Sequence, residues 1–146
     1  MQAREGRALG RDLAARLAQL RALTARIERR APEIAQAYRQ ALLKRIRDAG
    51  VDVPADDPRL LKEVAVFADR SDIAEELTRL RSHLGQSAAV LKAGGLTGRT
   101  LDFLVQELFR EINTVGSKAN DRFVAAEVVR FKTELERIRE QVQNIA

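Results

Sequence analysis

Two stretches of the sequence place acids, a base and cations at helical spacing. In the first, Asp72, Glu76, Arg79 and His83 share one stripe if the stretch is helical, because each residue turns an α-helix by about 100°. His83 is the only histidine of the chain, and an imidazole titrates near neutrality, so it can give or take a proton. A single histidine beside an apolar face is also a common structural hydrogen-bonding residue, and the spacing leaves both interpretations open.

The second stretch carries a pair of carboxylates. Glu107 and Glu111 share a stripe with Thr114 and Lys118, provided that helix continues as far as Lys118. Two carboxylates four residues apart can coordinate one divalent cation or flank a reacting group. The alternative is an ordinary solvated face, on which Arg110 balances the acids.

Residues 99–121 are unusually dense in polar groups for the middle of a helical bundle. They read RTLDFLVQELFREINTVGSKAND, and residues of low helix propensity gather around Gly116: Asn113, Ser117, Asn120 and Asp121. So many departures from local rules favour a functional site. A helix–loop–helix turn with Asp121 as N-cap explains the same residues, and we expect residues 116–121 to be a turn or a loosened segment.

Helices must position these residues. Ala, Leu, Arg, Glu and Gln are abundant and aromatic residues make up 4% of the chain, a composition typical of helical proteins. We expect helix over about residues 3–49, with a kink or restart at Pro32, and again after Asp57 as N-cap. At Ser71 or Asp72 the sequence allows two interpretations: one of these residues caps a new helix, or a single helix continues through both. Further helices are expected over residues 97–115 and 121–144.

The first and last of these helices have the clearest periodicity. Their apolar or small side chains recur at alternating steps of four and three residues, from Leu13 to Ala41 in one and from Val124 to Ile145 in the other. Such a heptad seam calls for a partner helix of similar length. The sequence therefore predicts an all-α helical bundle with a long antiparallel coiled-coil-like arm formed by the first and last helices. Residues 1–50 would be the long basic helix of the arm and 51–146 a helical domain with the polar motifs, in one structural unit.

The composition limits the cellular locations and binding partners expected for this chain. There is no cysteine, no apolar run long enough to span a bilayer and no signal-peptide-like start, so we expect a cytoplasmic protein without membrane contact. Residues 1–50 hold 12 basic and 5 acidic residues, and the remaining 96 residues hold 14 and 16. The first third is thus the basic part, which indicates either contact with a polyanion such as RNA or an Arg-rich solvated face.

Four segments resemble the C-terminal region of the YicC-like family. They are EGRALGRDL from Glu5, DIAEELTRLRSHL from Asp72, GRTLDFLVQELFREINTVGSKAND from Gly98 and KTELERIREQVQNI from Lys132. The resemblance implies a bacterial, cytoplasmic endoribonuclease that depends on a divalent metal, Mn²⁺ or Mg²⁺, with links to stress and small-RNA turnover. It also implies ring-like homo-oligomers, which are hexamers for the full-length members of the family, and an N-terminal domain ahead of the EGRAL-like segment.

Under this resemblance the polar residues acquire candidate roles. His83, Glu76, Glu107 and Glu111 would form the catalytic set. The same three glutamates would bind the metal, with Asp121 as a fourth ligand. The expected RNA-binding residues are Arg99, Arg110, Lys118, Asn113 and Asn120.

Two other functions are compatible with the sequence. One is an RNA-binding and oligomerisation module without catalysis of its own, and the other is a structural coiled-coil adaptor. The catalytic hypothesis requires that the stripes after Asp72 and after Arg99 meet in a shared pocket.

Overall fold

The computed structural model describes residues 2–94 and 98–145, without the side chains of residues 2–5 and 145. All regular structure within this part is helical, which confirms the all-α prediction. The elements are α1 (Gln2–Arg30), a 3-10 turn (Ala31–Glu33), α2 (Ile34–Asp48), α3 (Pro58–Arg70), α4 (Ala74–Ala93), α5 (Gly98–Ala119) and α6 (Arg122–Ile145). Thr97, where the helix over residues 97–115 was expected to start, lies outside the described residues, as does the side chain of Ile145.

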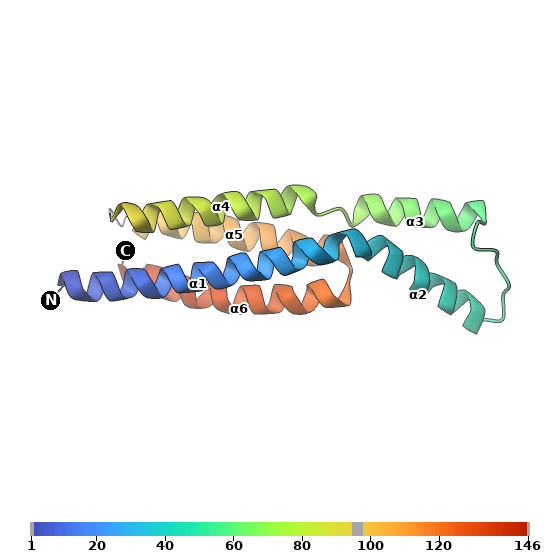
Figure 1. Cartoon of the computed structure of the whole chain (residues 1–146), viewed down its shortest axis with the longest axis horizontal. Coiled ribbons are helices and arrows are strands. Elements are labelled where there is room, and N and C mark those ends of the chain that lie inside the picture. Colours follow the sequence, from blue (N-terminus) through green and yellow to red (C-terminus); the bar gives the residue numbers. More distant parts are fainter. Residues whose placement is uncertain (1, 95–97, 146) are drawn as a thin grey trace.

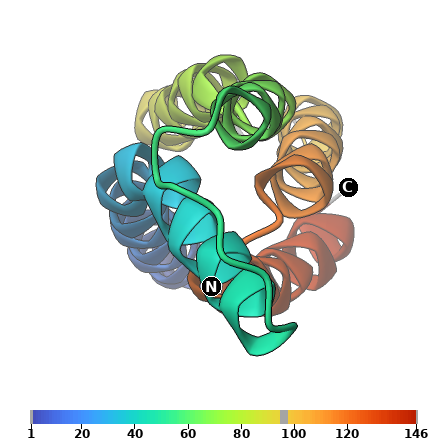
Figure 2. The same ribbon diagram turned by 90° about the vertical axis from the view of Figure 1, so that its right-hand side faces the viewer.

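Helices α1, α4, α5 and α6 pack into an antiparallel four-helix bundle (Figures 1 and 2). Each helix contacts two others, so that the order around the bundle is α1, α4, α5, α6. Leucine, isoleucine and valine side chains fill the centre, together with Phe131. The expected seams of the first and last helices are buried from Leu13 to Ile34 and from Val124 to Val142, apart from the half-buried Ala31. The first seam does not stay buried beyond Ile34: on α2, after the break at Pro32, Tyr38 is half-buried and Ala41 is exposed.

The first and last helices lie side by side and antiparallel. Ion pairs cross their contact from Arg16 to Glu134, from Arg26 to Glu127 and from Arg30 to Asp121. Helix α1 also packs against α4, so the α1–α6 pair forms two sides of the bundle. The division of the chain at residue 50 stays a prediction.

Pro32 divides the first predicted helical segment. Proline has no N–H to donate and its ring clashes with the preceding turn, so α1 ends at Arg30 and α2 begins at Ile34. Helix α2 ends before Gly50, whose φ of +79° suits a residue without a side chain. The expected break at Pro32 is therefore present as a short 3-10 turn.

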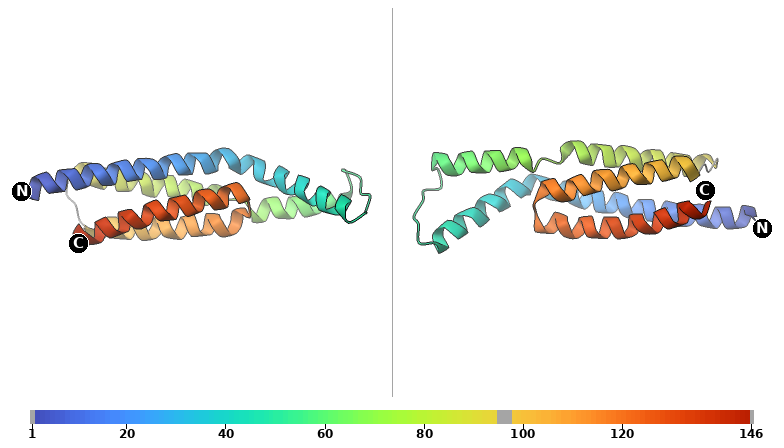
Figure 3. Two further views of the ribbon diagram at one scale, coloured as in Figure 1. Left: turned by 90° about the horizontal axis from the view of Figure 1, so that it is seen from below. Right: turned by 180° about the vertical axis from the view of Figure 1, so that it is seen from behind.

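Helices α2 and α3 reach beyond the end of the four-helix bundle, as Figure 3 shows from two sides. We call residues 34–70 the extension. The rings of Tyr38 and Phe67 stack near its base with centroids 3.8 Å apart. Asp57 caps α3 by accepting a hydrogen bond from the Arg59 N–H at 2.8 Å, as the sequence predicted.

The expected loosening over residues 116–121 is wrong for its first four residues. Helix α5 continues through Ala119, and Asn120, with φ +46°, and Asp121 form the link to α6. Asp121 then caps α6, because its carboxylate accepts a hydrogen bond from the Val124 N–H at 3.1 Å. Gly116 allows α5 to approach α6 closely, since a Cβ there would lie 3.3 Å from a methyl group of Val128.

Candidate active site between α4 and α5

The two polar stripes of the sequence face each other across the contact between α4 and α5. Because the helices are antiparallel, residues pair in reverse order along them: Glu76 with Lys118, Arg79 with Glu111, and His83 with Glu107. We call these six residues the polar ladder. The two stripes therefore meet, and their forming a shared pocket stays a prediction.

Two carboxylates of the polar ladder are buried and satisfied. Glu76 is 3% exposed and accepts hydrogen bonds from Lys118 Nζ at 3.0 Å and from Arg79 Nη2 at 3.2 Å. Glu111 is 5% exposed and accepts one from Arg79 Nε at 2.9 Å. A buried carboxylate is tolerated when it is paired and hydrogen-bonded, and Arg79 supplies this to both. The hydrogen bond with Glu111 raises the pKa of Arg79, so its charge is fixed.

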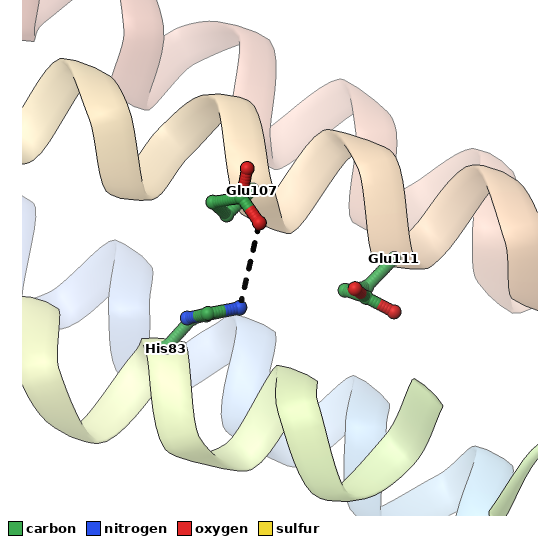
Figure 4. Close-up of side chains that lie close together, drawn as sticks. All are labelled: His83, Glu107 and Glu111. Carbon is green, nitrogen blue, oxygen red and sulfur yellow. Dashed lines mark ion pairs between the residues drawn. The ribbon is translucent and has the colours of Figure 1, made fainter. Parts of the chain in front are cut away.

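His83 and Glu107 form the last pair of the polar ladder, and Figure 4 shows their side chains facing each other from α4 and α5. Both side chains are partly buried, and His83 Nε2 lies 3.9 Å from Glu107 Oε2. The other imidazole nitrogen, Nδ1, is buried and has no hydrogen-bond partner. This histidine is therefore less completely bonded than a purely structural one, for which both nitrogens are normally satisfied.

His83, Glu107 and Glu111 form a group that could hold a metal ion. Each offers one ligand atom, and these atoms lie within 4.8 Å of one another. One imidazole nitrogen and two carboxylate oxygens are ordinary ligands of divalent cations. Arg79 already donates to Glu111, so a cation and the guanidinium would share the charge of this carboxylate.

The charge of the polar ladder leaves room for a cation. Three carboxylates face two cationic side chains, which leaves one negative charge while His83 is neutral. A cation bound beside His83 and Glu107 would balance this charge.

Glu76 and Asp121, the other expected metal ligands, lie outside this group. Glu76 is held by Lys118 and Arg79, one step further along the polar ladder. Asp121 is placed at the start of α6, where Arg30 Nη2 and Nε donate to its two oxygens at 2.8 and 3.1 Å. Both acids therefore have cationic side chains as their nearest partners.

The expected RNA-binding residues divide into two sets. Arg99, Arg110 and Asn113 are exposed on α5, whereas the ammonium group of Lys118 is bound to Glu76. Asn120 is exposed, and its backbone has a positive φ where α5 ends. Asparagine enters this left-handed region more easily than most residues, so Asn120 helps to end the helix.

Sequence reasoning gave no role to Arg79, which the structure places at the centre of the polar ladder. Its signal was available, because it lies three residues after Glu76 on the same stripe. Its second partner, Glu111, comes from another helix, and only the pairing of α4 with α5 brings the two together.

Comparison with known proteins identifies the family of this chain. Residues 27–146 match the family model described as endoribonuclease YicC-like, C-terminal. A probable endoribonuclease YicC of Clostridioides difficile is 42% identical over 147 aligned positions, which cover 99% of this chain and 50% of that protein. One of Haemophilus influenzae is 39% identical over 145 positions, again 99% of the chain and 50% of the relative.

The chain spans about half the length of these curated relatives. Within residues 2–94 and 98–145, no helix combines the length and apolarity that crossing a membrane needs. The match over most of the chain, together with the identity to both relatives, shows that the chain belongs to the YicC-like endoribonuclease family, as a match to its C-terminal part.

Proposed function

We propose that this chain carries the catalytic centre of a metal-dependent endoribonuclease and that the polar ladder is its site. The observation that carries the proposal is the convergence of His83, Glu107 and Glu111 from two helices. The names of the relatives supply the reaction class, cleavage of RNA phosphodiester bonds. Bacterial origin, a cytoplasmic location, a ring of six chains and a part in stress response and small-RNA turnover belong to the same proposal.

The donor set favours Mn²⁺ over Mg²⁺. Mg²⁺ prefers oxygen ligands, whereas an imidazole nitrogen suits a first-row transition ion better. His83, Glu107 and Glu111 would hold the ion. When bound, it would supply Lewis-acid stabilisation of the negative charge on the phosphate.

The residues of the chain itself would arrange the reaction. Arg79 fixes the Glu111 carboxylate, and Glu76 in turn fixes Arg79, so the acids are positioned before RNA arrives. In this arrangement His83 serves as a ligand of the ion, and its role as acid or base belongs to the alternative in which Glu107 and Glu111 alone hold the ion. Arg99 and Arg110 lie on the exposed side of α5, where they would contact phosphates.

Replacing the two expected glutamate ligands, Glu107 and Glu111, by glutamine tests this function. We expect Glu107→Gln and Glu111→Gln each to lower Mn²⁺-dependent cleavage of a labelled RNA on the order of 100-fold, because each removes a charged ligand. Mn²⁺ binding to the same proteins, followed by calorimetry without RNA, should weaken at least about tenfold. Glu140→Gln, on an exposed part of α6, is the matched control and should change neither quantity.

Circular dichroism would establish that the variants fold. Full cleavage by both ligand variants, or cleavage by the parent chain that EDTA leaves intact, would rule out the metal site.

The second candidate is an RNA-binding and oligomerisation module without its own catalysis. It is favoured by one observation, that the buried acids Glu76 and Glu111 already have cationic partners and need no further ion. Under this function, EDTA would leave RNA binding unchanged and no cleavage would appear with Mn²⁺. Binding would still weaken steeply with salt, because phosphate contacts release counterions.

A further inference from the structure

The outward face of α5 carries a second row of side chains beside the polar ladder. We call it the outer stripe. Its members recur at steps of four and three residues and all are exposed: Arg99, Phe103, Gln106, Arg110, Asn113 and Ser117. By helical geometry this row lies between the polar ladder and the side of α5 that packs on α6.

Phe103 is the apolar member of the outer stripe. It is 59% exposed, although a phenylalanine is normally buried in a chain with a core of this size. The other strongly exposed ring, Phe123, is 39% exposed and has the guanidinium of Arg26 over its face at 5.8 Å. In the part of the chain that the structure describes, no ring or guanidinium stacks on Phe103.

Cations flank this ring along α5. Arg99 lies one turn before Phe103, about 6 Å along the axis, and Arg110 lies about 10 Å after it. The nearest acid on α5 is Asp102, which accepts a hydrogen bond from the Gln106 amide at 3.0 Å. An exposed ring between two guanidinium groups is the arrangement that holds single-stranded nucleic acid, with a base on the ring and phosphates on the cations.

The outer stripe is also correctly placed for the proposed reaction. Glu107 follows Phe103 by one turn and lies only about 40° around the helix from it. A strand that stacks one base on Phe103 would therefore bring a neighbouring phosphate toward His83 and Glu107. This step rests on the proposed function of the polar ladder.

We propose that Phe103 is a stacking platform for an unpaired base of the RNA substrate, with Arg99 and Arg110 on the flanking phosphates. RNA fits this surface better than a second protein does. The core of a protein interface gathers several apolar side chains, whereas the other five members of the outer stripe are polar or charged. A ring face can stack only on a base that is not paired, so the substrate at this position is single-stranded.

Three substitutions at Phe103 separate stacking from apolar contact. Fluorescence anisotropy of a labelled single-stranded oligoribonucleotide, measured in EDTA, reports binding without cleavage. We expect Phe103→Ala and Phe103→Leu to weaken binding about tenfold, because both lose the ring face, whereas Phe103→Tyr keeps it and stays within about twofold of the parent. Phe123→Leu is the matched control, since it removes an exposed ring that Arg26 already covers, and it should leave the affinity unchanged.

Three outcomes would overturn the proposal. The first is a Phe103→Leu variant that binds as tightly as the parent. The second is equal loss of affinity for fully duplex RNA. The third is a change of oligomeric state in sedimentation while RNA affinity per chain is kept, which would make Phe103 a contact between copies.

The proposed function fails by a different result. A parent chain that binds the oligoribonucleotide but never cleaves it with Mn²⁺ would refute catalysis, while the Phe103 variants would still decide the stacking. A parent chain that binds no single-stranded RNA would refute the stacking platform directly.

Discussion

At the scale of single residues, Asp121 combines two interactions that the sequence suggested only in part. It caps α6 through the Val124 N–H, and it forms a two-point ion pair with Arg30 on α1. Burial alone would raise the pKa of the Asp121 carboxyl, but the hydrogen bonds from Arg30 and Val124 outweigh it and hold the pKa below its ordinary value. The carboxylate is therefore the form that the folded protein favours.

This predicts a pH-dependent contribution to stability. A carboxyl whose pKa is lowered by folding stabilises the protein above its unfolded pKa of about 4, and this contribution is lost as the pH falls through the lower, folded pKa. Asp121→Asn keeps a capping side chain but loses the charge. We expect it to lower the free energy of unfolding by about 1–2 kcal/mol at pH 7 and to approach the parent toward pH 2.

Urea denaturation at several pH values would measure this difference. Asp48→Asn is the matched control, because Asp48 pairs with Lys44 on an exposed surface of α2, where an ion pair contributes little. A constant difference between parent and Asp121→Asn from pH 7 to pH 2 would contradict the assignment.

Individual residues also show how much of the candidate site could be predicted from the sequence. Helical spacing was enough to place Glu107 and Glu111 on one stripe and His83 on another, because these relations are local. The expected ligand Asp121 depended on which side chain lies opposite, and Arg30 is 91 residues away in the chain. Spacing within one helix carries no information about such a partner.

At the scale of elements, the C-terminal half of α5 is helical against its local propensity. Gly116, Ser117 and Asn113 favoured a break, yet the helix runs on to Ala119. Ile112, Val115 and Ala119 are buried in the core before, between and after these residues, and their packing decides the conformation. Periodicity predicted α1 and α6 well because every turn of their seams repeats the same apolar spacing. The end of α5 has low helix propensity, and it is helical because its buried residues pack in the core.

Gly116 should therefore resist larger side chains for a reason of packing. We expect Gly116→Val to lower the free energy of unfolding by about 1–3 kcal/mol, because the new side chain would press on Val128 and separate α5 from α6. Gly85→Val in α4 is the control, since a Cβ at Gly85 meets no atom within 4 Å. Thermal unfolding of both variants measures the difference, and equal melting temperatures would contradict it.

At the scale of the whole molecule, the bundle and the extension differ in how they are supported. Each bundle helix packs on two neighbours, whereas α2 and α3 pack mainly on each other. Buried side chains in the extension are few, and Ile34, Leu60 and Phe67 are the principal ones. Segments with few buried contacts open more readily than a core does.

Hydrogen exchange should reveal this difference. We expect backbone amides of α2 and α3 to exchange at least about tenfold faster than those in the middle of α4, α5 and α6, because opening the extension leaves the bundle core intact. Mass spectrometry of peptic fragments would measure it. Equal protection in the two parts would show that the chain unfolds only as one unit.

The extension has a mechanical consequence as well. It is joined to the bundle at two narrow points, the 3-10 turn at Ala31–Glu33 and the short link after Arg70. Helix α2 has 15 residues, so it is roughly 22 Å long, and a tilt of about 10° at its base would displace its tip by about 4 Å. A small rotation near Pro32 would therefore be visible as a displacement of several ångströms at the far end of the extension.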